Sequence, residues 1–73
     1  MVIELIDVAS SNIAQMGYDP ISDELHIRFR ADSRLYKYQK VPAFVWKHFL
    51  KSKSKGEFLQ KIIVPYFEFT TEK

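Results

Sequence analysis

The strongest constraint on the fold is a strict alternation of apolar and polar residues in two neighbouring segments. In the first segment Leu25, Ile27 and Phe29 are separated by charged or polar residues. The segment from Arg34 to Lys40 alternates again, with two tyrosines on one side. A period of two is typical of a β-strand with one buried face and one solvated face. The two segments therefore predict an antiparallel pair of strands.

The turn at Asp32–Ser33 determines how these strands pair. With a two-residue loop, Phe29 would face Tyr36 and Ile27 would face Tyr38, so both tyrosines would share the apolar face. The opposite face would be basic and solvated, and it would hold His26, Arg28, Arg30, Lys37 and Gln39. With a three-residue loop the register would shift by one, so this basic face depends partly on the turn.

A strand before the hairpin and a helix after it are also predicted. The segment from Asn12 to Tyr18 should form the first strand and end at the turn Asp19–Pro20, because Asp caps the local backbone and Pro fixes φ. Pro42 suits the first turn of a helix, where a missing N–H costs nothing. Apolar residues at spacings of three and four predict that this helix runs to near Lys51.

A second, shorter helix is predicted from a capping box. Ser54 to Glu57 fits the S-x-x-E pattern, in which the Ser54 side chain accepts from the amide of Glu57 and the Glu57 side chain reaches back. The helix should stop at Pro65, which removes a donor and clashes with the preceding turn. The segment from Tyr66 to Thr70 alternates weakly and could add a strand.

Together these elements predict an α+β domain. A three-stranded antiparallel β-meander should pack one face against two short α-helices, and a terminal segment could add a further strand. We expect the 73 residues to form one domain, 1–73, near the size at which a hydrophobic core gives only a few kcal/mol of net stability. The sequence has no cysteine, so neither disulfides nor thiolate metal sites support it. The predicted core is Ile13, Leu25, Ile27, Phe29, Tyr36, Tyr38, Val45, Phe49, Phe58, Leu59 and Ile62.

A small net charge conceals a basic middle region. Of the 11 Lys and Arg residues, ten lie between Arg28 and Lys61, where Asp32 and Glu57 are the only acidic residues. Clustered cations attract polyanions whatever the total charge, although the same cluster could simply keep the protein soluble. The side chains expected to bind nucleic acid are Arg28, Arg30, Lys37, Lys51, Lys53 and Lys55.

The two tyrosines of the hairpin have two interpretations. Aromatic side chains on a sheet can stack with unpaired bases. Their alternation, however, places Tyr36 and Tyr38 on the face that the helices should cover. Core packing is therefore the favoured interpretation.

The sequence predicts no catalytic site, metal site or cofactor. The two histidines lack a third ligand at a recognisable spacing. No base is paired with Ser10 or Ser11, so turn formation is the expected role of these serines. The acidic loop from Asp19 to Glu24 lacks the pattern of a calcium loop. A small enzyme acting on a nucleic acid or nucleotide is the weakest alternative.

Targeting signals are also absent from the sequence. The segment from Met1 to Val8 carries acidic residues where a secretion signal would need basic ones. The longest uncharged stretch falls far short of the ~20 residues that span a bilayer. We therefore expect a cytoplasmic protein with no membrane partner.

Several short strings occur in an order that resembles one known family. They are Ser10-Ser11-Asn12-Ile13, Gly17-Tyr18-Asp19, Tyr36-Lys37-Tyr38, Val41-Pro42 and Ser54-Lys55-Gly56. Over roughly Val8 to Tyr66 the chain is similar to the KTSC domain, which also occurs at the C-terminus of some lysyl-tRNA synthetases. The family residues expected to be structural are Ser10, Ser11, Gly17, Tyr18, Asp19, Tyr36, Tyr38, Pro42, Ser54 and Gly56.

The resemblance implies a partner without naming a mechanism. Function is unestablished in that family, and its attachment to synthetases implies RNA. We therefore expect a non-catalytic module that binds RNA or another nucleic acid through a basic surface. The alternative is a protein-interaction module with an acidic partner or with docking at a free sheet edge. A homodimer is also compatible with such an edge.

Overall fold

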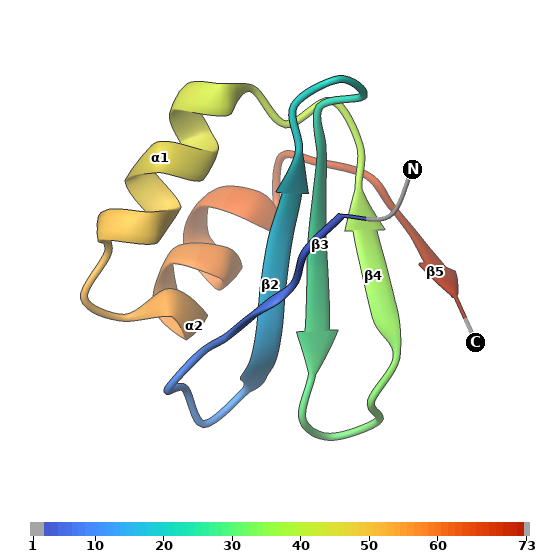
Figure 1. Ribbon diagram of the computed structural model, residues 1–73. Helices are drawn as coiled ribbons and strands as arrows, with labels where there is room; N and C mark the ends of the chain where they lie inside the picture. Colours follow the sequence, from blue (N-terminus) through green and yellow to red (C-terminus); the bar gives the residue numbers. More distant parts are fainter. Residues whose placement is uncertain (1–2, 73) are drawn as a thin grey trace.

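The computed structural model describes residues 3–72 and shows one sheet with helices packed on one face (Figure 1). The strands are β1 (Ile6–Asp7), β2 (Ile13–Asp19), β3 (Glu24–Phe29), β4 (Leu35–Tyr38) and β5 (Phe69–Glu72). Between β4 and β5 the chain forms α1 (Ala43–Lys51), α2 (Lys55–Phe58) and a π-helical turn, η1 (Leu59–Ile63).

All five strands are antiparallel and lie in chain order, β1-β2-β3-β4-β5. The α+β class, the antiparallel sheet and the two helices are confirmed. The expected count of three strands and a possible terminal fourth is too low, because both ends of the chain extend the meander. The N-terminal strand β1 pairs with β2, and the segment after the helices returns to pair with β4 as β5. That last strand starts three residues later than Tyr66.

The hairpin register differs from the expectation, whereas the assignment of faces is correct. Tyr36 lies opposite Ile27 rather than Phe29, and Tyr38 lies opposite Leu25 rather than Ile27. The connection runs from Arg30 to Arg34 and is longer than the expected two or three residues. Within it the Ser33 amide donates to the Phe29 carbonyl at 3.0 Å, and Ser33 adopts a φ of 57°. The register has moved by two, which is one full period of a strand, so each side chain keeps its face.

The core lies between the helices and the face that carries the tyrosines. Phe49 is fully buried, and its ring stacks on Phe58 at a centroid distance of 5.2 Å. Of the predicted core residues, Phe29, Tyr36 and Phe58 are partly buried against this core. The others, except Ile62, are buried. The predicted packing of the sheet against the two helices is therefore confirmed.

One predicted core residue is wrong because the chain forms a π-helical turn at this point. Ile62 was expected in the core but is 40% exposed, whereas its neighbour Ile63 is 0% exposed. The Val64 amide donates to the carbonyl of Leu59, five residues back, at 2.9 Å. Because such a turn holds more residues than an α-helical one, the side chain four positions after Leu59 returns to the core. The side chain three positions after it does not.

The sheet face away from the helices is partly covered, which corrects the expectation of a solvated basic face. In Figure 1 the N-terminal segment runs diagonally across β2 and β3. Gly17 lies beneath this segment, because a Cβ there would come within 2.8 Å of the Glu4 carbonyl oxygen and 2.9 Å of Leu5 Cδ2. His26, which lies opposite Gly17, is only 8% exposed and pairs with Glu24 at 3.2 Å.

The helix boundaries agree with the sequence signals, with two changes of detail. Pro42 is the residue just before α1 rather than its first residue. The Ser54 hydroxyl accepts from the Glu57 amide at 3.3 Å, which is one half of the expected capping box. The Glu57 carboxylate pairs with Lys61 at 3.0 Å instead of reaching back to the Ser54 amide. Within residues 3–72 no helix is long and apolar enough to cross a membrane.

Candidate nucleic-acid interface

The six basic side chains singled out from the sequence lie in separate parts of the fold. Arg28 and Lys37 belong to the sheet face away from the helices, in β3 and β4. Arg30 lies in the turn after β3. Lys51, Lys53 and Lys55 lie together in sequence where α1 ends and α2 begins. The basic window is thus not one continuous surface.

Both arginines hold the backbone of turns. Arg28 Nη1 donates to the Ser33 carbonyl at 2.6 Å. Arg30 Nε donates to the Ser10 carbonyl at 2.6 Å, and its Nη2 donates to the Val8 carbonyl at 2.9 Å. Their guanidinium groups therefore stabilise the hairpin turn and the segment before β2.

The helix junction presents lysines of two kinds. The side chains of Lys51 and Lys53 are exposed, and their ammonium groups form no hydrogen bond or ion pair with any residue of the described chain. Lys55 Nζ donates to the Ser52 carbonyl at 2.6 Å, and the Ser52 hydroxyl donates to the Phe49 carbonyl at 2.8 Å. Cations near a helix C-terminus complement its dipole, so Lys55 also stabilises the end of α1.

A hollow of about 430 Å³ lies between the helix junction and the loop before β2. We call it the polar hollow, and its lining includes Ser10, Ser11, Asn12, Lys53, Ser54 and Lys55. The Ser10 hydroxyl oxygen accepts from the amides of Asn12 and Ile13 at 3.2 and 3.3 Å, which fixes the loop. Gly56 leaves the space open, since a Cβ there would lie 3.4 Å from Asn12 Nδ2.

A second hollow, of about 600 Å³, lies beside β4 on the helix side of the sheet. We call it the aromatic hollow, and its lining includes Phe29, Arg30, Asp32, Tyr36, Tyr38 and Val64. Phe29 and Tyr36 pack edge to face at 4.9 Å. The Tyr36 hydroxyl donates to Asp32 Oδ2 at 3.2 Å. Burial raises the pKa of the Tyr38 phenol above its ordinary value, and neighbouring Tyr36 adds to the shift.

The two hollows share Ser11, Asn12 and Gln60. They are therefore adjacent; we call the pair the groove, which has lysines at one end and aromatic rings at the other. The expectation that the tyrosines pack in the core is correct for Tyr38, whereas Tyr36 is only half-buried. Both tyrosines also line the groove, so packing in the core and contact with a ligand in the groove are compatible.

Sequence reasoning did not identify Asn12 or Gln60 as site residues. Gln60 lies on the exposed side of a helical turn, where a polar residue is ordinary. One signal was present: the family strings around Ser10 and Gly56, far apart in the chain, meet at the polar hollow.

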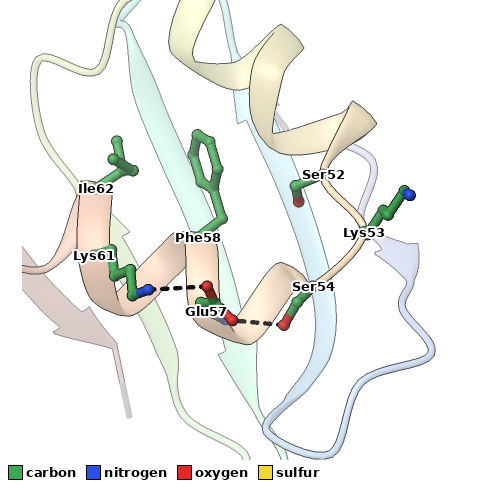
Figure 2. A pocket seen from close by; sticks show the side chains of 7 residues that line it. All are labelled: Ser52, Lys53, Ser54, Glu57, Phe58, Lys61 and Ile62. Atoms are coloured by element: carbon green, nitrogen blue, oxygen red, sulfur yellow. Dashed lines mark hydrogen bonds and ion pairs between the residues drawn. The ribbon is translucent and has the colours of Figure 1, made fainter.

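A third hollow, of about 370 Å³, opens on the other side of α2 and is shown in Figure 2. Phe58 and Ile62 form its apolar part. The ion pair between Lys61 and Glu57 lies along it, so that the Glu57 carboxylate is held by a cation. This outer hollow shares Lys53, Ser54 and Glu57 with the polar hollow, and it shares no residue with the aromatic hollow.

Other residues of the family strings serve the scaffold. The Tyr18 hydroxyl donates to the Val41 carbonyl at 2.6 Å, and its ring stacks on Trp46 at 5.6 Å. Burial raises the pKa of Tyr18 to about 12, and the neighbouring Asp23 carboxylate adds to the shift. The Asp19 carboxylate accepts from the Ile21 amide at 2.9 Å. That hydrogen bond holds the pKa of Asp19 below its usual value.

The fold and the groove define a small α+β domain with a five-stranded antiparallel sheet, one helical layer and a concave surface between them. Within that class the chain belongs to the KTSC domain family, whose model matches residues 9–67. The resemblance expected from the sequence over Val8 to Tyr66 is confirmed.

Two related proteins agree with this assignment. The crystal structure of a KTSC domain protein from Yersinia pestis superposes with a TM-score of 0.93 at 32% identity, covering 99% of this chain and 100% of that one. A protein of Tsukamurella paurometabola is 38% identical over 60 residues, which are 82% of this chain and 88% of the relative.

Proposed function

We propose that this domain is a non-catalytic module that binds single-stranded RNA in the cytoplasm. One observation supports the proposal: the exposed side chains of Lys51 and Lys53 at the helix junction have no partner within residues 3–72, and Lys53 lines the polar hollow. Cations placed in this way neutralise phosphates and release condensed counterions. A cation held by a carboxylate would contribute less.

The shape of the surface favours a single strand over a duplex. The groove is concave, and its aromatic rings are recessed between the sheet and the helical layer. Bases in a duplex are stacked on one another, so only the edges of the bases and the backbone are accessible. An unpaired base can enter a groove and stack on an aromatic ring.

The proposal is non-catalytic because no reactive constellation is evident. Within residues 3–72 no group of three or more His, Cys, Asp or Glu side chains could hold a metal ion. The Ser10 and Ser54 hydroxyl oxygens accept from backbone amides. These interactions suit a binding surface, and they supply no general base for a nucleophile.

The test is the binding of the purified domain to matched RNA and DNA strands, single and duplex, measured by fluorescence anisotropy. At about 50 mM salt we expect single-stranded RNA to bind most tightly, and at about 200 mM its affinity should fall at least tenfold. Equal and weak affinity for all four ligands would contradict the proposal.

A second candidate function is protein interaction at the free edge of β5. Among the described residues β5 pairs only with β4, and Tyr66 and Phe69 nearby are 75% and 50% exposed. An edge strand can accept a strand of another protein, acidic or otherwise, or of a second copy. Light scattering checks for a homodimer. If single-stranded RNA displaces a captured acidic protein, then the two candidates share a surface at the lysines.

A further inference from the structure

We propose that the groove holds one unpaired nucleotide, with its phosphate in the polar hollow and its base in the aromatic hollow. This inference rests on the proposed function and adds base contact to what electrostatics alone would provide. The two hollows measure about 430 and 600 Å³, within the ~300–1,000 Å³ typical of small-ligand sites. Because Ser11, Asn12 and Gln60 line both, one ligand can contact the two at once.

The charges assign the direction of the nucleotide. Lys53 and Lys55 line the polar hollow, and the Glu57 carboxylate there is held by Lys61 at 3.0 Å. Within residues 3–72 the lining of the aromatic hollow has one carboxylate, Asp32, whose negative charge offsets the positive charge of Arg30. A phosphate is therefore attracted to the lysine end, and Asp32 disfavours it at the other end.

The aromatic hollow supplies what a base requires. Tyr36 is half-buried and is held by its hydrogen bond to Asp32 at 3.2 Å, so a stacking surface would be fixed before the ligand arrives. Asn12 and Gln60, whose side chains end in amides, line both hollows. An amide can both donate and accept, which suits the ribose hydroxyls and the polar edges of a base.

The first experiment compares two strands of equal charge. An oligouridylate of about eight nucleotides and the same ribose-phosphate strand without bases are titrated against the domain at low salt. If a base stacks in the groove, the intact strand binds roughly fivefold to a hundredfold more tightly, the effect that stacking of one base gives on alanine substitution. Equal affinity for the two strands overturns the inference.

A matched pair of variants locates the contact. Gln60→Glu places a carboxylate between the two hollows, and Ile62→Glu makes the same charge change on the outer side of the same turn. We expect Gln60→Glu to reduce the ratio of the two affinities towards one, whereas Ile62→Glu leaves that ratio as in the parent. Equal effects of the two variants on the ratio overturn the inference. Thermal unfolding of each variant checks that it is folded.

Small probes test the direction of the nucleotide. In NMR titrations, uridine should shift the amide signals of Asp32 and Tyr36, and inorganic phosphate should shift those of Lys53 and Lys55. Uridine 5′-monophosphate should shift both sets, and the reversed pattern overturns the assignment. Salt-sensitive binding with equal affinity for strands with and without bases would overturn this inference but leave the proposed function standing. The absence of any binding to RNA would overturn both.

Discussion

Gly17 determines how closely the N-terminal segment approaches the sheet. A Cβ at this position would lie 2.8 Å from a backbone oxygen, that of Glu4, and backbone atoms cannot move aside as a flexible side chain can. We expect Gly17→Ala to lower the free energy of unfolding by about 1–3 kcal/mol, as overpacking does elsewhere. Chemical denaturation measures the loss.

A further measurement on Gly17→Ala tests whether the loss of stability comes from displacement of the N-terminal segment. If the segment is displaced, the neighbouring His26, now 8% exposed, becomes accessible to diethyl pyrocarbonate in the Gly17→Ala variant. The other histidine, His48, is exposed in the parent and serves as the internal control. A variant with parental stability and a protected His26 would show that the segment does not pack on Gly17.

Tyr18 makes stability depend on pH in the alkaline range. Its folded pKa of about 12 lies above the ordinary value of 10.0, because burial, and then Asp23, disfavour the phenolate. The neutral phenol therefore contributes stability below pH 10, and this contribution is lost as the pH rises towards 12. Phenolate absorbance should show Tyr18 titrating near 12, and Tyr18→Phe should remove one tyrosine from the high-pH part of the titration. A Tyr18 that titrates near 10 would contradict this prediction.

Among the helices, α1 stabilises the fold through Phe49. Its ring is fully buried and contacts Phe58 and Trp46 at centroid distances of 5.2 and 6.2 Å. We expect Phe49→Ala to cost about 3–5 kcal/mol, comparable to the whole stability of a domain of this size. The control is Leu50→Ala on the same helix, where the side chain is 41% exposed. A Phe49→Ala variant that melts like the parent would refute this account.

At the start of α2, Gly56 allows stability and binding to be separated. An alanine there favours the helix by about 0.5–1 kcal/mol. Its Cβ would lie 3.4 Å from Asn12 Nδ2, at the polar hollow. We expect Gly56→Ala to melt no lower than the parent and to bind single-stranded RNA more weakly. Unchanged affinity together with retained stability would show that the polar hollow is not used.

The elements also show what the sequence could and could not predict. Alternation in β3 and β4 assigned each side chain to the correct face, because a register error of two leaves a strand's faces unchanged. Helical periodicity could not predict that Ile63 is buried and Ile62 exposed, since an α-helical pattern does not reveal where a π-helical turn will form. The pairing of β1 was equally hidden, because a strand of two residues has no period.

The whole molecule separates charges that are neighbours in the sequence. Arg28 and Lys37 lie on one side of the sheet, and the lysines of the helix junction lie beyond the other. Residue counts predicted a basic region, but only the three-dimensional arrangement shows two surfaces. For the same reason the groove could not be predicted. Its walls come from the loop before β2, the hairpin and the helices, and no single stretch of sequence contains them.

This separation allows the two surfaces to be compared by removing two charges from each. We expect the double variant Lys51→Gln and Lys53→Gln to weaken RNA binding. It should also reduce the slope of log affinity against log salt by roughly 1.4, since each phosphate contact on a single strand contributes about 0.7. The matched variant, Arg28→Gln with Lys37→Gln, should leave that slope nearly unchanged. Anisotropy titrations across a range of salt concentrations measure both slopes. If instead the Arg28 and Lys37 variant reduces the salt slope and the Lys51 and Lys53 variant does not, the strand binds across the sheet. The lysines of the helix junction would then keep the protein soluble and complement the dipole of α1.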